Sequence, residues 1–317
     1  MKKGTLGKLF KTREFTIIVV LIILTTVFGT LSENFLSTSN LKNIFIQISS
    51  IGIASVGMTI IIITAGIDVS AGSILGVIAV VAGKSALAGI PVPLIIILAI
   101  LAGGLLGSIN GSLVSFTGIP PIIVTLGTMS FLRAMVYQLL GGRWISSFPE
   151  TFRRIGTGDF IHIPTPVWFM ILFAIIFTYY LKYRPTGRYI YAIGSNPEAA
   201  RLSGIPVKKM LLLVYVLAGM MYGVAGVIVA GRTGIVQTNT GAGFELSVIA
   251  ATVLGGTNIM GGEGSAIGSM LGALLVAVIT NGMVLVNLPA LTEGLIIGTI
   301  IIISVLTDIL KLKRRSV

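Results

Sequence analysis

The residue types that carry catalytic chemistry are scarce in this chain. A nucleotide-binding loop needs Gly-x-x-x-x-Gly-Lys-Ser/Thr; the sequence has Gly83-Lys84-Ser85, but Ile78 stands where the first glycine belongs. There is no cysteine and no His-Glu-x-x-His, and His162 is the single histidine. A metal cluster or a Ser-His nucleophile is therefore not expected. We expect no catalytic residue, no metal ligand and no bound cofactor on this chain.

Local signals for a short, well-terminated helix gather in residues 194–206. Asn196 is suited to cap a helix N-terminus, Pro197 suits the first helical position, and Glu198 complements the positive end of the helix dipole. Gly204 is typical of the residue after a helix end. The predicted helix has about two turns, which is marginal in water alone. We therefore expect it to pack on the rest of the chain or on a partner.

Ionisable and amide side chains within apolar runs are the other candidates, because burying them in lipid is costly. Asp68 interrupts two apolar runs, and it is expected either to line a path at a helix break or, as we favour, to cap the next helix. Arg133 lies within an apolar run and needs a partner or a polar cavity. The amides of Asn110, Asn258 and Asn281 can donate and accept hydrogen bonds with a hydroxyl-rich ligand, although bonds between helices are their commoner role.

The elements that must position these residues are membrane helices. The chain has 317 residues, 55% apolar and 10% charged, whereas a soluble domain is roughly half apolar and a quarter charged. Apolar runs of about 20 residues recur without the alternation of barrel strands. We predict an all-α polytopic membrane protein of about ten spans, with eight or nine full spans and a re-entrant piece as the alternative. The expected spans are residues 15–31, 43–64, 72–90, 93–117, 121–140, 166–182, 210–231, 244–259, 264–283 and 288–310.

The net charge of +12 is explained by topology and not by nucleic-acid binding. Most lysines and arginines lie before the first span, after the sixth and after the last, which predicts cytoplasmic N- and C-termini. We expect a transmembrane domain, residues 15–310, between a basic cytoplasmic N-terminus, 1–14, and a basic tail, 311–317. Within it, residues 141–165 form an external loop and residues 183–209 a cytoplasmic loop.

The external loop contains Trp144, Phe148, Phe152 and Phe160 among charged residues. It is either a docking surface or an amphipathic segment with its aromatic side chains at headgroup depth. The sequence alone favours neither.

Small residues at a spacing of four mark three spans. They are Gly103-Gly107-Gly111, Gly219-Gly223 and Gly264-Gly268-Gly272. Such stripes let helix backbones approach closely, and we interpret them as packing within the chain and not as a dimer contact.

Several segments occur in an order that is specific to one family. They are Gly-Ile-Asp-Val-Ser-Ala-Gly-Ser at 66–73, Thr-Leu-Gly-Thr-Met at 125–129, Pro-Thr-Pro-Val-Trp at 164–168, Thr-Gly-Arg-Tyr-Ile-Tyr-Ala at 186–192, Gly-Ser-Asn-Pro-Glu-Ala-Ala-Arg-Leu-Ser-Gly-Ile at 194–205, and Gly-Gly-Thr-Asn at 255–258 with Gly-Gly-Glu-Gly-Ser at 261–265. Together they resemble the permease subunits of ABC importers for monosaccharides, the ribose-permease type. The resemblance runs from about residue 35 to 310, with Ala71 where a valine is more usual.

The resemblance implies a subunit of the bacterial cytoplasmic (inner) membrane that forms the translocation path for a monosaccharide, D-ribose first, commonly as a homodimer. A separate cytoplasmic ABC ATPase, which binds ATP and Mg²⁺, and an external sugar-binding protein are the implied partners. The coupling helix that contacts the ATPase corresponds to Asn196, Pro197, Glu198, Ala199, Ala200, Arg201, Leu202, Ser203 and Gly204. Glu198 and Arg201 either make polar contacts with the ATPase or pair with each other. Candidates for the translocation path are Asp68, Ser70, Asn110, Thr125, Asn258 and Asn281.

Three alternatives compete with this interpretation. A branched-chain amino-acid permease shares a similar plan, but the segment at 66–73 favours the sugar type. An ion-coupled secondary sugar transporter needs a titratable relay in the spans, for which Asp68 alone is thin support. A scaffold protein has no need of a well-terminated cytoplasmic helix.

Overall fold

The computed structural model describes residues 13–289, 292, 294–302 and 306, and this part of the chain is mainly helical. The helices are α2 (Arg13–Leu31), α3 (Thr38–Ile63), α4 (Ala71–Leu87), α5 (Val92–Thr117), α6 (Pro121–Leu140), α7 (Glu150–Thr157), α8 (Thr165–Tyr183), α9 (Pro185–Ser195), α10 (Pro197–Leu202), α11 (Val207–Thr233), α12 (Phe244–Leu254) and α13 (Ala266–Leu285). The strands are β1 (Ile145–Ser146), β2 (Asp159–Phe160), β3 (Ile163–Pro164) and β4 (Ile235–Val236). Both strand pairs, β1 with β4 and β2 with β3, are antiparallel.

Six of the described helices are long and apolar enough to cross a membrane, namely α3, α5, α6, α8, α11 and α13. The predicted spans 15–31, 72–90 and 244–259 correspond to shorter apolar helices, Ile17–Leu31, Ala71–Leu87 and Phe244–Leu254. The predicted span 288–310 lies partly outside the described residues, as do most of the segment 1–14 and all of the tail 311–317. The all-α membrane architecture is present, and the count of about ten spans is not confirmed.

The α12 helix shows why one predicted span was too long. It ends at Leu254, whereas the apolar pattern predicted a helix to residue 259. Gly256 has φ +90°, a left-handed conformation that an α-helix cannot contain. An α-helix of this length rises only about 16 Å, roughly half the hydrocarbon thickness of a bilayer.

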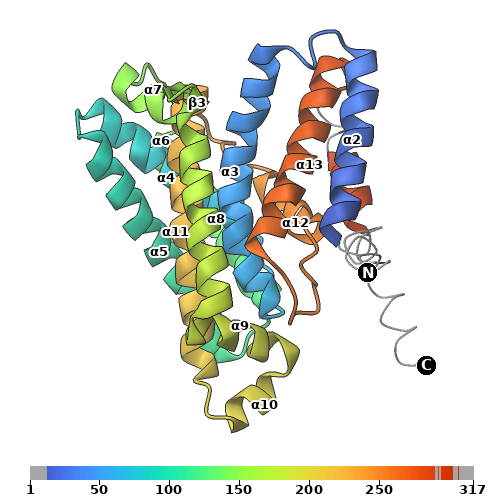
Figure 1. Ribbon diagram of the computed structural model, residues 1–317. Helices are drawn as coiled ribbons and strands as arrows, with labels where there is room; N and C mark the ends of the chain where they lie inside the picture. The colour runs from blue at the N-terminus through green and yellow to red at the C-terminus, as the bar shows by residue number, and fades with distance from the viewer. Residues whose placement is uncertain (1–12, 290–291, 293, 303–305, 307–317) are drawn as a thin grey trace, which may run out of the picture.

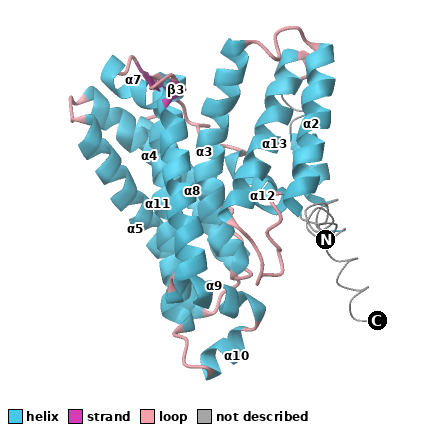
Figure 2. Ribbon diagram, in the orientation of Figure 1, coloured by secondary structure: helices cyan, strands magenta, loops and turns pink. Residues whose placement is uncertain are grey.

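The centre of the bundle is α3, whose membrane-length window is almost wholly buried. Figure 1 shows α3 between α8 and α11 on one side and α13 and α2 on the other. The bundle has two distinct ends, which Figures 1 and 2 show at the bottom and the top. The α10 end carries α9 and α10, and the α7 end carries α7 and the short strands.

The glycine stripes bring α5 and α11 into backbone contact. A Cβ atom at Gly103 or Gly107 would clash with the carbonyl oxygen of Gly219 or Tyr215, respectively, and one at Gly223 would clash with that of Ala99. The third stripe makes the same kind of contact with α12, because a Cβ at Gly272 would meet the Ala251 carbonyl oxygen. The interpretation of these stripes as packing within the chain is confirmed.

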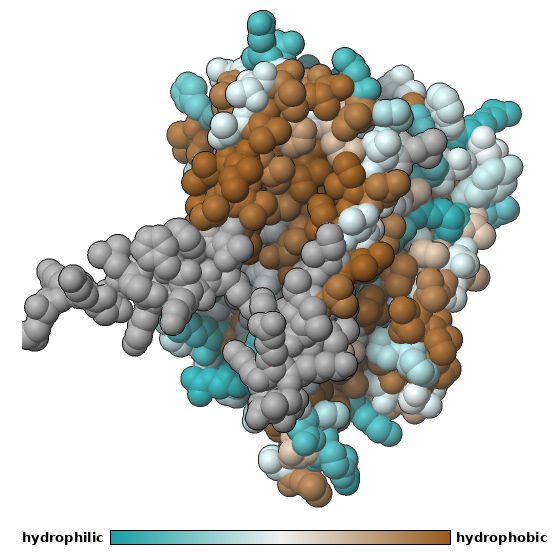
Figure 3. All heavy atoms as spheres, turned by 90° about the vertical axis from the view of Figure 1, so that its right-hand side faces the viewer, coloured by the Kyte–Doolittle hydropathy of each residue, from teal (hydrophilic) through white to brown (hydrophobic). Residues whose placement is uncertain are grey.

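The outside of the bundle is apolar. Figure 3 shows hydrophobic residues over much of the face that includes α2, with hydrophilic residues at its top and bottom. Exposed side chains there include Ile18, Ile22 and Ile23, and on another helix, α5, Leu101 and Leu105 are exposed. In a bundle of this composition, these side chains face lipid.

The segment 141–165 divides its aromatic side chains between two environments. Phe148 and Phe152 are buried and pack edge to face, whereas Trp144 and Phe160 are exposed. Two of the four aromatic side chains therefore pack on the protein, and the other two lie on its surface. α7 is held against the protein through Phe152, and Trp144 is left on the surface.

Candidate functional site

The short helix at the α10 end forms as its sequence predicts. The Asn196 Oδ1 atom accepts hydrogen bonds from the backbone N–H groups of Glu198 (3.1 Å) and Ala199 (2.9 Å), so Asn196 is the N-cap of α10. Pro197 occupies the first helical position. Gly204 follows the C-terminus with φ +82°, the left-handed conformation that commonly ends a helix. Each terminus of this six-residue helix is therefore fixed by its own sequence.

The surface of α10 is unusual for so small an element. Ala200 is buried, whereas Leu202 is 74% exposed. Glu198 and Arg201 form an ion pair on the surface, with Arg201 Nη2 at 2.6 Å from Glu198 Oε1. The hydrogen bond from Arg201, and then its charge, lower the pKa of the Glu198 carboxyl. The pairing of these two residues within the loop, one of the two predicted alternatives, is what the structure contains.

The neighbouring helix α9 connects α10 to the transmembrane helices. The backbone of Gly194 lies directly against the Ile63 carbonyl group at the end of α3 and against the backbone nitrogen of Gly262. The Gly262 N–H donates to the Ile63 carbonyl oxygen at 2.9 Å. The Tyr191 hydroxyl of α9 donates to the Gly264 carbonyl oxygen at 2.8 Å. We call the meeting of α9, the end of α3 and the loop 255–265 the α9 junction.

Four of the six predicted path residues meet in one buried cluster inside the bundle. The Asp68 Oδ1 atom accepts hydrogen bonds from the backbone N–H (2.9 Å) and the hydroxyl (2.6 Å) of Ser70. The Asn110 Nδ2 group of α5 donates to the Ser70 hydroxyl oxygen at 2.7 Å. The Thr125 hydroxyl of α6 contacts the Ile67 carbonyl oxygen at 3.2 Å. These bonds tie α5 and α6 to the segment between α3 and α4.

The expectation that Asp68 caps the next helix is wrong. α4 begins at Ala71, and Ser70 is its N-cap residue, without a side-chain capping bond. Asp68 lies two residues earlier and closes a local turn onto Ser70. Asp68 stabilises the entry into α4 through Ser70, and Asn110 binds the same hydroxyl from across the bundle.

The two remaining path candidates lie elsewhere. The Asn281 side chain of α13 exchanges two hydrogen bonds, each 2.9 Å, with Asn40 of α3. The Asn258 Oδ1 atom accepts from the Met260 backbone N–H at 3.0 Å within the loop 255–265. Asn281 thus serves helix-to-helix bonding, the commoner alternative for an amide. Arg133 has a partner as required, because its guanidinium donates to the Thr240 carbonyl oxygen at 2.9 Å.

We expect Asp68→Asn to be mild and Asp68→Ala to be severe. Asparagine keeps the Oδ1 acceptor for both Ser70 donors, so the free energy of unfolding should fall by about 1 kcal/mol or less. Alanine leaves buried donors unpaired, which costs about 1–3 kcal/mol for each. Thermal unfolding in detergent and a transport assay measure both variants. Transport retained by Asp68→Asn contradicts a proton relay through Asp68, and transport abolished with stability intact supports one.

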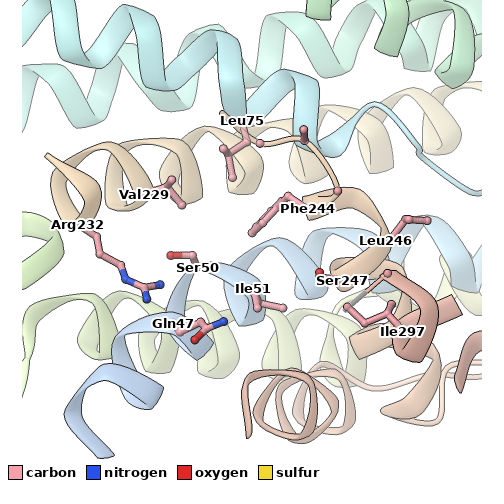
Figure 4. Close-up of a pocket in the computed structure, with 14 residues that line it drawn as sticks. Gln47, Ser50, Ile51, Leu75, Val229, Arg232, Phe244, Leu246, Ser247 and Ile297 are labelled. Carbon is pink, nitrogen blue, oxygen red and sulfur yellow. The ribbon is translucent and has the colours of Figure 1, made fainter. Parts of the chain in front are cut away.

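A cavity of about 380 Å³ lies away from this cluster, between α3, α4, α11 and α12. Figure 4 shows the side chains of Gln47, Ser50 and Arg232 around one space, with Phe244 on the side of α12. None of the six predicted path residues lines it. Sequence reasoning missed Gln47, Ser50 and Arg232 as site residues. The available signal was Gln47, an amide among the isoleucines of α3.

Comparison with known proteins places this architecture in a family. The model of the family described as branched-chain amino acid transport system / permease component matches residues 40–305. The ribose import permease protein of Haemophilus influenzae is 37% identical over 92% of this chain and 91% of its own length. The D-allose transport system permease protein of Escherichia coli is 36% identical over 91% of this chain and 89% of its length. The autoinducer 2 import system permease protein of Photorhabdus luminescens is 32% identical over 93% of this chain and 89% of its own length. No solved structure matches.

The sequence resemblance to ABC importer permeases is thereby confirmed, and it covers the transmembrane helices together with the α9 junction and α10. The chain belongs to the branched-chain amino acid transport system / permease component family, and ribose import permeases are among its relatives.

Proposed function

We propose that this chain is the membrane subunit of an ATP-driven importer and forms the translocation path for a monosaccharide, with D-ribose as the first candidate. The relatives at 37% identity are ribose import permeases. The D-allose and autoinducer 2 permeases are nearly as similar, so allose and autoinducer 2 are the next substrates to test. The proposed location is the bacterial cytoplasmic membrane, with both termini in the cytoplasm and two permease copies in the assembly.

One observation carries the proposal: α10 is a helix built to be rigid that presents an exposed leucine at its end. Burying an isolated leucine contributes about 1.5–3 kcal/mol when a partner covers it. Leu202 is 74% exposed, whereas Ala200 packs on the chain. The helix is fixed at both ends by Asn196 and Gly204. A rigid, partly apolar projection can transmit the conformational change of a cytoplasmic ATPase to the transmembrane helices. ATP and Mg²⁺ would bind to that ATPase and not to this chain.

We expect Leu202→Glu to release the ATPase from the complex. The tagged chain is extracted from its native membrane in mild detergent and the co-purified subunits are identified by mass spectrometry. Wild type should bring down an ATPase, and Leu202→Glu should reduce its recovery more than about tenfold, since loss of the leucine contact alone is worth about 1.5–3 kcal/mol. Gly204→Arg, which places a large side chain at φ +82°, should act in the same direction.

Trp144→Glu is the matched control, because Trp144 is 65% exposed at the opposite end of the bundle. It should leave ATPase recovery unchanged. Recovery of the chain alone from wild-type membranes, with uptake that persists when ATP is depleted and the ion gradient is kept, would overturn the proposal. For the wild-type complex, uptake of radiolabelled ribose, allose and autoinducer 2 identifies the substrate.

A further inference from the structure

The cavity lined by α3, α4, α11 and α12 has polar groups in its wall, and the Ser50 hydroxyl and the Arg232 guanidinium have no hydrogen-bond partner among the described residues. The Ser50 hydroxyl is buried and forms no hydrogen bond with a described residue. The Gln47 Nε2 group donates to the Thr280 hydroxyl oxygen at 2.8 Å, which fixes the orientation of the amide. Buried polar groups normally have hydrogen-bond partners, so an unpartnered hydroxyl at a cavity wall points to a ligand or an ordered water.

Arg232 supplies the only positive charge at this wall among the described residues. No described carboxylate forms an ion pair with it. Its guanidinium has five N–H donors in a fixed planar arrangement. Figure 4 shows it directed toward Gln47 and Ser50. A half-buried arginine without a counter-charge is costly, and a ligand rich in acceptor oxygens would offset this cost.

Apart from Ser247 and the backbone of residues 241–243, the rest of the cavity wall is apolar, and one side chain is aromatic. Phe244 lies at the start of α12, opposite Leu75 and Val229. The volume of about 380 Å³ falls in the range of small-molecule sites, roughly 300–1,000 Å³. This cavity has hydrogen-bonding groups on one side and the aromatic ring of Phe244 on the other. It could therefore bind a molecule that has hydroxyl groups at its edges and C–H groups on its faces. A cyclic monosaccharide has this chemistry.

We propose that this cavity is a monosaccharide-binding site within the permease itself, with Gln47, Ser50 and Arg232 as hydrogen-bonding groups and Phe244 as the surface that contacts the sugar ring. The inference rests on the proposed function. It adds that the permease holds its substrate at a defined site in addition to the site of an external binding protein. The guanidinium would also bind an anion, so inorganic phosphate is the competing ligand in the test.

The test is sugar-dependent stabilisation of the purified full-length chain in detergent. A ligand that binds only the folded state raises the unfolding temperature in a saturable way. Wild type should show this rise with D-ribose or D-allose, and Arg232→Met and Gln47→Leu should weaken the apparent affinity at least tenfold. Arg153→Met is the matched control at the same end of the bundle, because Arg153 lies on α7 and does not line the cavity.

Three outcomes overturn the inference: no shift with either sugar, a shift that both cavity variants retain, or a shift with inorganic phosphate and none with sugar. If Arg232→Met fails to fold, Ser50→Ala removes one hydroxyl without changing charge and should itself weaken the apparent affinity for the sugar. ATPase recovery in the pull-down does not depend on this cavity. Normal recovery without sugar binding would therefore reject the sugar site and leave the proposed function standing.

Discussion

Replacing Gly107 with leucine should leave almost no folded permease. Gly107 lies where α5 crosses α11, and a Cβ atom there would be closer than 3.0 Å to the Tyr215 carbonyl oxygen. The clash is with backbone, so no change of side-chain rotamer relieves it. Separating the helices also removes the contact between Gly103 and Gly219 one turn away. Overpacking a core costs about 1–3 kcal/mol when side chains can adjust, and we expect at least about 3 kcal/mol here.

Size-exclusion profiles and thermal unfolding in detergent measure this effect. Gly127→Leu is the matched control, because Gly127 lies on α6 with no atom within 4 Å of a Cβ at that position. Leucine has a higher helix propensity than glycine, by up to about 1 kcal/mol, so the control should be as stable as wild type or more stable. A monodisperse Gly107→Leu protein with wild-type unfolding temperature would show that the two helices do not pack as described.

The sequence predicted best where neighbouring residues determine the structure. α10 was predicted from Asn196 and Gly204, because a capping side chain reaches a backbone N–H only three residues away. The glycine stripes on α5 and α11 were predicted to pack within the chain, because the spacing of four places them on one helix face.

What the sequence could not predict depends on contacts across the bundle. Asp68 does not cap α4, because the helix starts at Ala71 and its N-cap residue, Ser70, is bonded to Asn110 of α5. Asn281 has its partner 241 residues away in Asn40. The periodicity of residue types along one helix does not reveal hydrogen bonds between side chains on different helices. The cavity was missed for the same reason, since Gln47 and Arg232 belong to helices that only the folded chain brings together.

The α9 junction is one route by which a movement of α10 can enter the transmembrane helices; the other is the direct connection of α10 to α11 through residues 203–206. α9 and α10 share Asn196, which ends the first helix and caps the second. Two residues before Asn196, at the same end of α9, the Gly194 backbone touches Ile63 and Gly262, and the Gly262 N–H donates to the Ile63 carbonyl oxygen. A displacement of α10 is therefore passed to the end of α3 and to the loop 255–265 through backbone contacts. This path matters only if α10 is the docking point for the ATPase, as proposed.

We expect Gly194→Val to uncouple transport from ATP hydrolysis in a chain that still folds. A Cβ at Gly194 would clash with the Ile63 carbonyl oxygen, so α9 must move away from the end of α3. The chain still folds because Gly194 lies at the end of a short, partly exposed helix, whereas Gly107 lies in the middle of a long helix that crosses another. Transport should fall more than about tenfold, which corresponds to about 1.4 kcal/mol, while the ATPase still co-purifies. Reconstituted vesicles loaded with ATP and the ATPase subunit report sugar uptake and phosphate release together.

Two further variants separate coupling from folding at the α9 junction. Ser195→Ala is the neighbouring control, because the Ser195 hydroxyl donates only to the Tyr191 carbonyl oxygen of its own helix; its uptake should match wild type. Tyr191→Phe removes only the hydroxyl that donates to the Gly264 carbonyl oxygen, and it should give a smaller loss in the same direction as Gly194→Val. Wild-type uptake by Gly194→Val would mean that the backbone contact with α3 does not carry the movement, and the contact of α9 with α8 would become the route to test.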